Sequence, residues 1–517
     1  MKSPLHNTGG WIARWAAARG SRPALVDGST RFDYRQLEAR VARLVGWLRA
    51  SGVGPGDRVA ILLGNRAAYL EILFATARVG AISLPINTRL TAQEIRFLFE
   101  DARPDLLFHE ANLGETVETA CRAASTAPAL RVAVGDETSR VPADPYQAAL
   151  AAAKPDPKIE PVAPDDPMML MYTSGTTGAS KGALLPHRKA LFNSLNAQLY
   201  LGIRHDDRVL VTAPLFHSLG LLILSVPALY AGACIVLQRR FDPESVWRCV
   251  ESEGIRYFGG VPTIYAGLLE PFSGTGTEPY DLRSLRFLFT AGSAASPELV
   301  RSYARRGLVL IQGYGQTETS ILCCLDPRDA ERKAGSVGRP VFHAEVRAIA
   351  LDTLDGPTEA WRGVARGETG EVVARGPITM LGYWERPEDS ERTLRDGWVR
   401  TGDLAQIDDE GFFSLTGRVD DMFISGGENV YPAEIEAVYL AHPAVREVAV
   451  VGVADSRWGQ VGCAHVVLEA GQTLDPDALR RWGAGALAGF KLPERFVVHD
   501  ALPRTASGKI QKHRLQA

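Results

Sequence analysis

A run of glycines, hydroxyl side chains and one lysine follows a short apolar segment in the first half of the chain. The apolar residues 167–172 predict a buried strand, and residues 173–182 hold the run. Glycines let a backbone turn sharply and bring its N–H groups close to an anion, while hydroxyl groups donate hydrogen bonds and a lysine adds positive charge. The segment is therefore predicted to bind phosphate groups through Thr173, Ser174, Gly175, Thr176, Thr177, Gly178 and Lys181.

The spacing of this segment differs from that of the common nucleotide loop. A P-loop has four residues between its glycines and a Lys followed by Ser or Thr. Here two residues separate Gly175 from Gly178, and Gly182 follows Lys181. A P-loop phosphotransferase is thus the weaker hypothesis, although a nucleotide or another phosphate ligand is still expected.

The composition is that of an ordinary globular protein with more than one domain. The chain has 517 residues, of which 46% are hydrophobic and 23% charged, and its net charge is −3. A single core does not grow to this length, and no basic excess indicates nucleic acid. Six scattered cysteines without metal-ligand spacing are typical of buried thiols in a reducing compartment. We therefore expect a cytoplasmic location and no signal peptide.

Residues 209–237 form an uncharged stretch that is long enough on paper to span a membrane. Pro227 and Gly232 interrupt it, and its last residues are β-rich. The stretch is interpreted as a strand, a buried helix and a second strand, so no membrane span is expected.

Helices and strands alternate through the large first part of the chain. Hydrophobic spacing predicts helices over 34–51 and 67–79 and strands over 58–63 and 81–85. Thr91 and Glu94 form a capping box that opens a further helix. Alternation of this kind predicts mainly parallel sheets covered by helices. Residues 110–164 are expected to form a less regular connection.

Four later strands, predicted over 209–213, 256–258, 285–289 and 309–312, each end in small or polar residues. Open parallel sheets bind ligands beyond the carboxyl ends of their strands. These ends are therefore predicted to line one crevice together with the glycine-rich segment. The residues concerned are His217, Gly259, Gly260, Val261, Ala291, Gly292, Ser293, Ala294, Gly313, Tyr314, Gly315, Thr317 and Glu318.

Two of these side chains have an ordinary interpretation when taken alone. His217 could be a hydrogen-bonded core histidine, and Glu318 a carboxylate at a helix N-terminus. Beside a polyphosphate, however, Glu318 is a natural Mg²⁺ ligand. The combination of residues, more than either one, indicates a binding site.

The pattern changes after residue 335. Short β-rich pieces and frequent turns over about 335–417 predict a β-rich subdomain, near whose end Asp403 could hold a ribose diol or cap a turn. A helix, two strands and a helix are then predicted between residues 432 and 486. The expected domains are 1–419, with the subdomain, and a small α+β C-terminal domain, 420–517, with its hinge near Asp420.

Taken in order, these motifs closely resemble the adenylate-forming superfamily of acyl- and aryl-CoA synthetases, luciferases and peptide-synthetase adenylation domains. The resemblance runs from the glycine-rich segment to Lys509, and residues 420–432, 455–460 and 490–493 are similar to the acyl-CoA synthetase branch. One departure is Ser180, where the family usually has proline. It removes no phosphate contact.

The resemblance implies an AMP-forming acid–CoA ligase that works in two steps. The carboxylate of the acid attacks the α-phosphorus of Mg·ATP, which gives an acyl-adenylate and pyrophosphate. The thiol of coenzyme A then displaces AMP, after the small domain has rotated about Asp420. ATP and coenzyme A are thus the expected co-substrates, and Mg²⁺ the expected cofactor.

The resemblance also implies a role for individual residues. Lys509, His217, Glu318 and Thr317 are expected to be catalytic, with Glu318 and Thr176 at the metal. Besides the glycine-rich segment, ATP would be bound by Ser293, Ala294, Gly313, Tyr314, Gly315, Thr317, Asp403, Arg418 and Lys509. The acid would lie against His217, Gly259, Gly260, Val261, Ala291, Gly292 and Gly315. Coenzyme A would contact Arg89, Ser425, Gly426, Gly427 and Trp458.

The acid is expected to have an uncharged tail. The predicted pocket carries no Lys, Arg, Asp or Glu, and a second charge buried without a partner would cost several kcal/mol. Fatty acids are slightly favoured, and aromatic acids such as benzoates or hydroxycinnamates are the alternative. No nucleic acid partner and no transmembrane segment are expected, and peripheral membrane association and a homodimer are left open.

Three other classes are weaker. A P-loop phosphotransferase would release ADP, and a non-catalytic acyl- or nucleotide-binding protein would have no use for Lys181, Glu318, Asp403, Arg418 and Lys509 together. A luciferase-like oxygenase would share the first half-reaction.

Overall fold

The computed structural model describes residues 1–135, 144–173, 180–269, 280–425, 428–473, 475–484, 486–504 and 510–515. The chain divides into two compact units. The first comprises Met1–Thr173, Lys181–Val346 and Ala374–Val399, and the second Ser174–Ser180, Arg347–Val373 and Arg400–Ala517. The expected domain limits, 1–419 and 420–517, stay a prediction.

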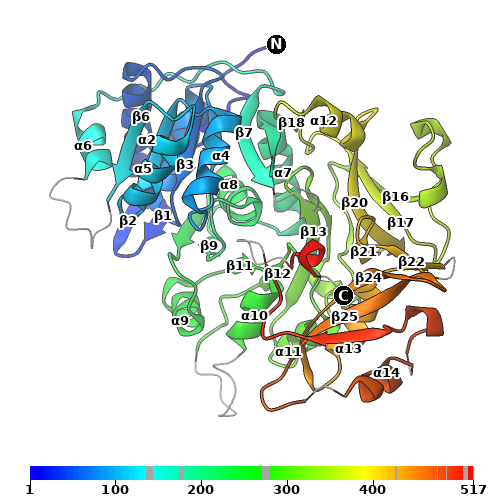
Figure 1. The fold of residues 1–517 in the computed structure, drawn as a ribbon. Coiled ribbons are helices and arrows are strands. Elements are labelled where there is room, and N and C mark those ends of the chain that lie inside the picture. Colours follow the sequence, from blue (N-terminus) through cyan, green and yellow to red (C-terminus); the bar gives the residue numbers. More distant parts are fainter. Residues whose placement is uncertain are drawn as a thin grey trace. The chain divides into compact units, whose positions relative to one another are not determined.

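A seven-stranded sheet lies in the first unit (Figure 1). Its strand order is β18-β8-β7-β4-β3-β5-β6. Strands β3 to β7 run parallel to their neighbours, whereas β8 and β18 are antiparallel additions. The strands are β3 (Arg58–Leu62), β4 (Ile82–Pro85), β5 (Leu106–Glu110), β6 (Leu130–Val134), β7 (Pro167–Thr173), β8 (Lys181–Pro186) and β18 (Gly382–Tyr383).

Helices cover this sheet, as the alternating pattern predicts. They are α2 (Tyr34–Ala50), α3 (Ala67–Arg78), α4 (Ala92–Ala102), α5 (Gly114–Ala123) and α6 (Pro145–Ala152). In α4, Ile95 and Phe99 pack with Val117 of α5 over Leu62 and Leu107 of the sheet.

The helix start predicted from the capping box is confirmed. The Thr91 hydroxyl accepts the Glu94 N–H at 3.3 Å, while the Glu94 carboxylate accepts the Thr91 N–H at 2.8 Å. The expectation of an irregular connection over 110–164 was wrong in part, because α5, β6 and α6 lie there. The Pro and Asp residues of the segments between these short elements favoured an irregular interpretation of the whole stretch.

A nine-stranded sheet forms the other core of the first unit. Its order is β15-β14-β13-β12-β11-β9-β10-β1-β2, and all neighbours from β13 to β1 are parallel. The strands are β1 (Pro23–Asp27), β2 (Thr30–Asp33), β9 (Arg208–Val211), β10 (Cys234–Leu237), β11 (Tyr257–Gly260), β12 (Phe287–Thr290), β13 (Leu310–Gln316), β14 (Ser320–Cys324) and β15 (Arg339–Pro340). The four strands that were expected to end in one crevice, β9, β11, β12 and β13, are therefore adjacent and parallel.

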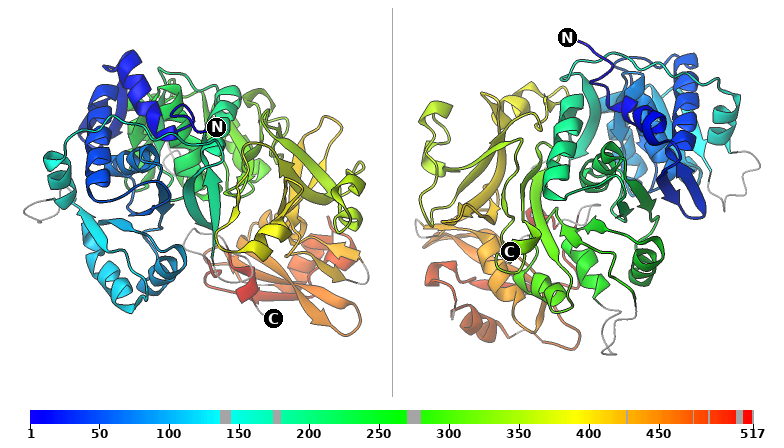
Figure 2. Two further views of the ribbon diagram at one scale, coloured as in Figure 1. Left: turned by 90° about the horizontal axis from the view of Figure 1, so that it is seen from above. Right: turned by 180° about the vertical axis from the view of Figure 1, so that it is seen from behind.

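The remaining helices of the first unit are α1 (Trp11–Arg19), α7 (His187–Tyr200), α8 (Val226–Ala231), α9 (Pro243–Glu253), α10 (Pro262–Leu268), α11 (Pro297–Ala304) and α12 (Pro387–Thr393). Helix α1, dark blue in Figure 2, packs on α2 and also contacts α8, where the Trp15 indole donates to the Tyr230 carbonyl at 2.9 Å. Helix α1 thus contacts both α2, which covers the seven-stranded sheet, and α8, which precedes β10 of the nine-stranded sheet.

The uncharged stretch 209–237 folds as the sequence predicts. Strand β9 is followed by a π-helix, η3 (Leu219–Ser225), by α8 and by β10. No helix within the described residues is both long and apolar enough to cross a membrane.

Two smaller sheets are formed by later parts of the chain. One contains β16 (Glu345–Ala350), β17 (Gly370–Arg375), β20 (Trp398–Ile407) and β19 (Leu394–Arg395) in that order, with β21 (Phe413–Arg418) paired to β20. The division between the units falls within β16, β17 and β20, and β19 belongs to the first unit. The short strands agree with the β-rich pattern expected for residues 335–417.

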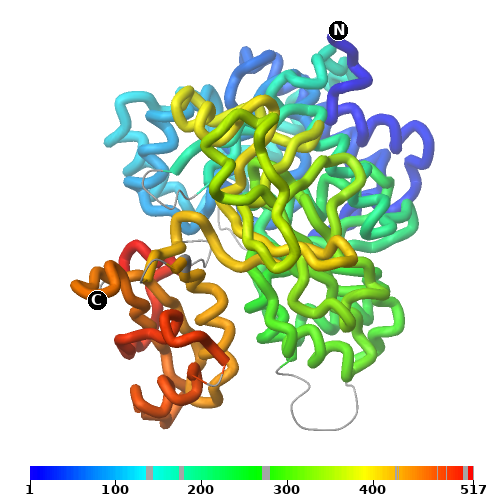
Figure 3. Tube along the Cα trace, turned by 90° about the vertical axis from the view of Figure 1, so that its right-hand side faces the viewer, coloured from blue at the N-terminus to red at the C-terminus, as the bar shows by residue number. Residues whose placement is uncertain are grey.

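The C-terminal part of the second unit is a compact α+β group, orange and red in Figure 3. Its sheet has the order β23-β22-β25-β24, with β26 paired to β25. Ile435, Tyr439 and Leu479 from the helices pack on Val450 and Val466 of the strands. The elements are β22 (Phe423–Ser425), β23 (Glu428–Val430), α13 (Pro432–Leu440), β24 (Val445–Asp455), β25 (Gly459–Leu468), α14 (Pro476–Ala484) and β26 (Arg495–Val498). The predicted helix, two strands and helix are confirmed.

A buried ion pair fastens α3 to α2. The Arg78 side chain has no solvent exposure, and both of its terminal nitrogens donate to the Glu38 carboxylate at 2.6 Å. Its third donor, Nε, bonds to the Gly9 carbonyl at 3.0 Å. The pair therefore holds η1 (Thr8–Gly10) as well as the two helices.

Glu38→Ala should lower the free energy of unfolding by about 3–5 kcal/mol, because it leaves the Arg78 charge buried without its partner. Urea unfolding followed by circular dichroism measures the loss. Arg248→Ala is the control, since it removes an exposed ion pair with Glu244 and should cost under about 0.5 kcal/mol. Equal stabilities of the two variants would contradict the importance of the buried pair.

Candidate active site

Glu318 lies in the tight turn that joins β13 to β14. The Thr319 hydroxyl accepts the Gln316 N–H at 3.2 Å, and Ser320 has a left-handed backbone with φ 58°. A Cβ on Gly315 would lie 1.8 Å from the Ser320 carbonyl oxygen. Only glycine fits there, so the hairpin itself requires Gly315 and holds Glu318 at the end of the parallel strands.

The Glu318 carboxylate meets the strand that leads into the glycine-rich segment. Its Oε1 accepts hydrogen bonds from the Tyr383 hydroxyl at 3.0 Å and from the Thr173 hydroxyl at 3.4 Å. The Glu318 backbone carbonyl accepts the Met380 N–H at 2.7 Å, and the residue is 8% exposed. The structure thus brings the end of β7 to the end of β13, as expected from the strand ends.

Lys181 also contacts Tyr383, the residue that donates to Glu318. Its ammonium is 5.6 Å from the centre of the Tyr383 ring and 2.9 Å from Asp389 Oδ1 on α12. The hydrogen bond from Lys181 holds the pKa of Asp389 below its ordinary value. Burial, and then the nearby Glu318 carboxylate, raises the pKa of the Tyr383 phenol, which therefore remains a protonated donor at neutral pH.

Tyr383 and Asp389 were missed by the sequence analysis. Tyr383 is in the short strand β18 and Asp389 is in α12, which follows it. Strand β18 reaches the site because it pairs with β8, with Gly382 opposite Leu184. A two-residue strand gives no hydrophobic pattern of its own. Its place beside β8 depends on a pairing between residues far apart in the chain.

The start of α7 positions the segment that contacts Glu318. Lys189 is buried and donates to the Ile378 carbonyl at 2.6 Å, and Arg188 donates to the Pro377 carbonyl at 2.7 Å. Burial lowers the pKa of Lys189 well below its ordinary value. These bonds hold the backbone that leads to Met380, whose N–H donates to the Glu318 carbonyl. Lys189 and Arg188 therefore support Glu318 indirectly. The sequence analysis missed both of them.

The predicted acid-binding residues surround the ends of the same strands. His217 is half-buried, and its ring lies 4.7 Å from that of Phe216. A Cβ on Gly259 would come within 2.9 Å of Leu224, and one on Gly313 within 2.7 Å of the Phe289 ring. These two glycines accommodate neighbouring apolar side chains.

The remaining predicted positions in this region differ in exposure. Gly292, Ser293 and Ala294 are exposed, while Ala291 and Tyr314 are buried. Gly260 is buried, and Val261 and Thr317 are intermediate. Their assigned contacts with ATP or the acid stay predictions.

In the second unit, the structure brings together the two residues expected at the ribose. Asp403 of β20 and Arg418 of β21 are directly opposite in the strand pairing, and their charged groups lie 3.2 Å apart. Asp403 is 9% exposed.

The residues expected at coenzyme A and at the hinge differ in burial. Arg89, Asp420 and Trp458 are exposed, and the Arg457 guanidinium lies 4.7 Å from the Trp458 ring centre. Ser425 is buried in β22. The predictions for Ser174, Gly175, Thr176, Thr177, Gly178, Gly426, Gly427 and Lys509 fall outside the described residues.

The donor set around Glu318 suits Mg²⁺ that arrives with a nucleotide. Across the described part of the chain, no three His, Cys, Asp or Glu side chains gather to hold a metal ion. Mg²⁺ is commonly held by one or two carboxylates together with substrate phosphates and waters. One carboxylate beside hydroxyl groups, with Lys181 nearby, fits that kind of site.

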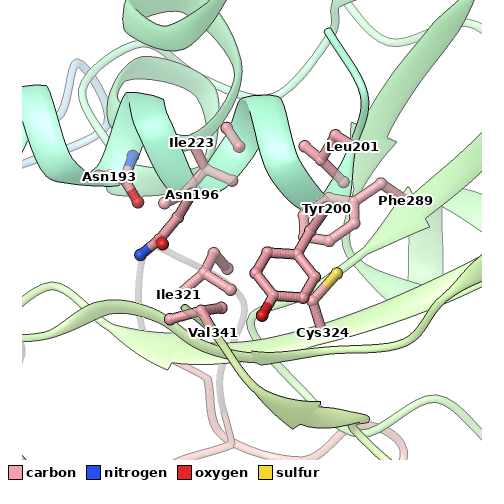
Figure 4. A pocket seen from close by; sticks show the side chains of 10 residues that line it. Asn193, Asn196, Tyr200, Leu201, Ile223, Phe289, Ile321, Cys324 and Val341 are labelled. Carbon is pink, nitrogen blue, oxygen red and sulfur yellow. The ribbon is translucent and has the colours of Figure 1, made fainter. Parts of the chain in front are cut away.

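An almost wholly apolar cavity lies beside the strand ends (Figure 4). It is enclosed by α7, the π-helix and strands β12 and β14, with Ile223, Phe289, Ile321 and Cys324 among its lining residues. None of the lining side chains is charged. The volume open to the centre of a water molecule is about 20 Å³, which suits about one small group.

Comparison with protein families decides the identity of the chain. A family of AMP-binding enzymes matches residues 12–384, and the C-terminal domain of AMP-binding enzymes matches residues 434–509. The chain belongs to the AMP-binding enzyme family.

Curated relatives of this AMP-binding enzyme are CoA ligases. A feruloyl-CoA synthase of an Amycolatopsis species is 41% identical over 505 residues, covering 98% of this chain and 97% of the relative. An indoleacetate–CoA ligase of Aromatoleum aromaticum is 40% identical over 510 residues, 97% of this chain and 96% of that one. The long-chain-fatty-acid–CoA ligase FadD13 of Mycobacterium tuberculosis is 34% identical over 514 residues, 97% of each chain.

A solved structure agrees with these relatives. The o-succinylbenzoate CoA synthetase of Bacillus subtilis, in complex with an acyl-adenylate intermediate, superposes with a TM-score of 0.87. It is 31% identical and covers 100% of this chain and 99% of its own. The predicted superfamily, fold class and AMP-forming acid–CoA ligase class are confirmed.

Tyr383→Phe should lower adenylation at limiting Mg²⁺ by roughly 10-fold or more, because Glu318 loses the nearer of its two hydroxyl donors and hydrogen bonds to charged groups contribute about 1.5–3 kcal/mol. Acid-dependent pyrophosphate release across a Mg²⁺ titration measures the change, which should diminish at saturating metal. The control is Tyr230→Phe, an aromatic contact of Trp11 remote from the site. A Mg²⁺ dependence equal to that of the parent would exclude a positioning role for Tyr383.

Proposed function

We propose that this AMP-binding enzyme joins an aromatic carboxylic acid to coenzyme A, using ATP and Mg²⁺. The observation that carries the choice of acid is the small, uncharged cavity between α7 and β14. The acid would extend from the reacting residues near Glu318 into this cavity.

In the first step, the acid carboxylate would attack the α-phosphorus of ATP, and the bond to pyrophosphate would break. The glycine-rich segment with Thr173 and Lys181 would hold the outer phosphates, as backbone N–H groups and hydroxyls do in phosphate sites. Mg²⁺, when bound by Glu318 and Thr176, offsets the negative charge of those phosphates. Thr317 would lie at the α-phosphate.

Lys181 has a partner that phosphate can replace. Its ammonium is held by Asp389 at 2.9 Å, and both side chains are partly accessible. Incoming phosphate oxygens would compete for the same donor, while the ring of Tyr383 keeps the ammonium in place from one side. The ion pair thus keeps the lysine ordered before the nucleotide arrives.

The nucleoside would be bound through Tyr314 at the adenine and through Asp403 and Arg418 at the ribose. A carboxylate accepts hydrogen bonds from a diol, and the 3.2 Å pairing with Arg418 keeps Asp403 oriented. Asp403 is mostly buried, so its lone pairs have little competition from water.

In the second step, the coenzyme A thiol would attack the carbonyl carbon of the acyl-adenylate, and AMP would leave. Ser425, Gly426 and Gly427 would leave room for the pantetheine, with Arg89 and Trp458 toward its far end. Rotation of the small domain about Asp420 would remove Lys509 from the reacting carbon and admit the thiol in its place. His217 would border the acid in both steps.

Two considerations favour an aromatic acid over the fatty acid preferred on sequence alone. The cavity holds the space of about one small group, which suits the end of a compact ring and not a long flexible chain. The feruloyl and indoleacetate ligases are also more similar in sequence to this chain than the fatty-acid ligase is.

A panel of acids, scored for AMP with and without coenzyme A, tests the assignment. Phenylpropenoic and arylacetic acids should give a kcat/KM at least about 10-fold above dodecanoic and hexadecanoic acids, since the cavity cannot take a long chain without displacing well-packed side chains. Faster turnover of the fatty acids would transfer the assignment to them, and release of ADP in place of AMP would overturn the ligase chemistry altogether.

Lys509→Ala separates the two half-reactions. If Lys509 meets the negative charge that develops between carboxylate and α-phosphate, acid-dependent pyrophosphate release should fall ~10²- to 10³-fold. Thioester formation from synthetic acyl-adenylate should persist, because the lysine has then left the site. Lys512→Ala, at a nearby lysine that pairs with Glu436 at 2.8 Å, is the control. Pyrophosphate release within about threefold of the parent would make Lys509 an ordinary surface residue.

A further inference from the structure

A kink in strand β20 carries Asp403, the residue assigned to the ribose. Gly402 has a left-handed backbone with φ 68°, and the pairing of β20 with β21 shifts register shortly after it, between Leu404 and Ala405. A Cβ on Gly402 would lie 3.0 Å from Arg418 Nη2. The kink therefore favours glycine, whose backbone turns easily and has to be held by hydrogen bonds if the next residue is to keep its place.

The peptide that follows Gly402 is held at both ends. Its carbonyl, on Gly402, accepts the Val419 N–H at 2.8 Å. Its N–H, on Asp403, donates to the Thr401 hydroxyl at 3.1 Å, and that hydroxyl in turn donates to the Val372 carbonyl at 2.7 Å. These bonds leave the peptide that precedes Gly402 to other partners.

The peptide that precedes Gly402 is held by Glu371, which lies on β17, the strand beside β20 (Figure 1). The Gly402 N–H donates to Glu371 Oε1 at 3.1 Å. The other end of this peptide, the Thr401 carbonyl, lies 3.5 Å from Arg418 Nη2, which is long for a hydrogen bond. Glu371 thus makes the shorter of the two contacts that fix this peptide.

A buried ion pair orients the Glu371 carboxylate. The Glu371 side chain is 2% exposed, and Arg400 Nη2 donates to its Oε2 at 2.7 Å. Arg400 lies only two residues before Gly402, so the carboxylate meets both donors from one short segment of β20. A buried carboxylate needs a counter-charge and donors for its lone pairs. Arg400 supplies the charge, and the Gly402 N–H is a further donor.

The carboxylate of Asp403 depends on the backbone that Glu371 holds. Asp403 is mostly buried and lies directly opposite Arg418 in the strand pairing, with their charged groups 3.2 Å apart. A ribose diol offers two hydroxyl groups to one carboxylate. Both hydrogen bonds keep good length and angle only if the carboxylate has one orientation, so a turn of the backbone at Gly402 would weaken at least one of them.

We propose that Glu371 is a positioning residue for the nucleotide sugar. Through the Gly402 N–H it holds Asp403 where its carboxylate accepts both ribose hydroxyls, and the enzyme thereby selects ribonucleoside over deoxyribonucleoside triphosphates. This inference rests on the proposed function, in which Asp403 binds the ribose of ATP. Glu371 acts through Gly402 and Asp403.

Three nucleotides test the arrangement: ATP, 2′-deoxy-ATP and 3′-deoxy-ATP. They share the adenine and the triphosphate, so the ratio of their kcat/KM values for acid-dependent pyrophosphate release reports the sugar alone. In the parent enzyme, each deoxynucleotide should be poorer than ATP by about 10-fold or more, because it leaves a buried charged acceptor without one of its donors.

Two double variants separate the Gly402 bond from the ion pair. Glu371→Gln/Arg400→Met removes both charges and keeps an amide oxygen that can accept the Gly402 N–H. Glu371→Leu/Arg400→Met removes both charges and the acceptor. The first should retain the preference for ATP within about threefold of the parent ratio, whereas the second should lower the preference to about threefold or less. Glu371→Met/Arg400→Met is a second variant without the acceptor, in case the leucine variant does not fold.

Glu368→Leu provides the matched control in the connection between β16 and β17. Glu368 also combines an ion pair with a main-chain bond, since it accepts Arg362 at 2.8 and 2.9 Å and the Ala365 N–H at 2.7 Å. This variant should show the nucleotide ratios of the parent. Ratios are compared within each variant, so a loss of folded protein cancels.

The outcomes separate this inference from the function beneath it. A variant without the acceptor that keeps the parent's preference for ATP would overturn the role of Glu371, and so would a glutamine variant that loses the preference as fully as the leucine variant. A parent enzyme that uses all three nucleotides equally well would also overturn it, while leaving the ligase reaction intact. Failure to form AMP from ATP with any acid would instead overturn the proposed function.

Discussion

Glu318 accepts hydrogen bonds from Thr173 and Tyr383, and through them three segments that are distant in the sequence meet at one point. One segment ends the seven-stranded sheet at β7, and another ends the parallel run of the nine-stranded sheet at β13. The third is the short strand β18. A carboxylate this buried must be met by donors, so the three segments have to be in place before the site exists.

The two lysines near this carboxylate, Lys181 and Lys189, differ in burial and therefore suit different roles. Lys181 is partly exposed and paired with Asp389. Lys189 is fully buried, and its short bond to the Ile378 carbonyl serves the backbone beneath Glu318. Desolvation disfavours the charged form of a buried lysine, so Lys189 suits a structural role and Lys181 a ligand-binding one.

The glycines of the strand ends also divide into kinds. Gly315 is required by the hairpin, since any side chain would strike the Ser320 backbone. Gly259 and Gly313 make room for Leu224 and for the Phe289 ring, and Phe289 in turn lines the cavity. A small residue at a strand end therefore does not by itself mean open space for a ligand. The position of the cavity follows from which side chains fill the gaps that the glycines leave.

Much of the fold and part of the site could be predicted from the sequence. The capping box at Thr91, the strands β3, β4 and β7, and the parallel ends of β9, β11, β12 and β13 depend on local hydrogen bonding and on hydrophobic period, which neighbouring residues encode. The order of the motifs was sufficient to indicate the superfamily. Short elements over 110–164 were missed because the turn-forming residues between them dominate the pattern of the stretch.

Other features exist only in the tertiary structure. Tyr383 reaches Glu318 because β18 pairs with β8, and the Gly402 N–H is held by Glu371, 31 residues away in the chain. Neither partner can be read from local sequence, because a long-range pairing is selected by the packing of whole sheets and helices. The sequence by itself indicated the family and many of the elements, and it predicted the residues that would carry phosphate chemistry. The tertiary structure decided which of their neighbours support them, since that depends on the partners that every other buried polar group finds.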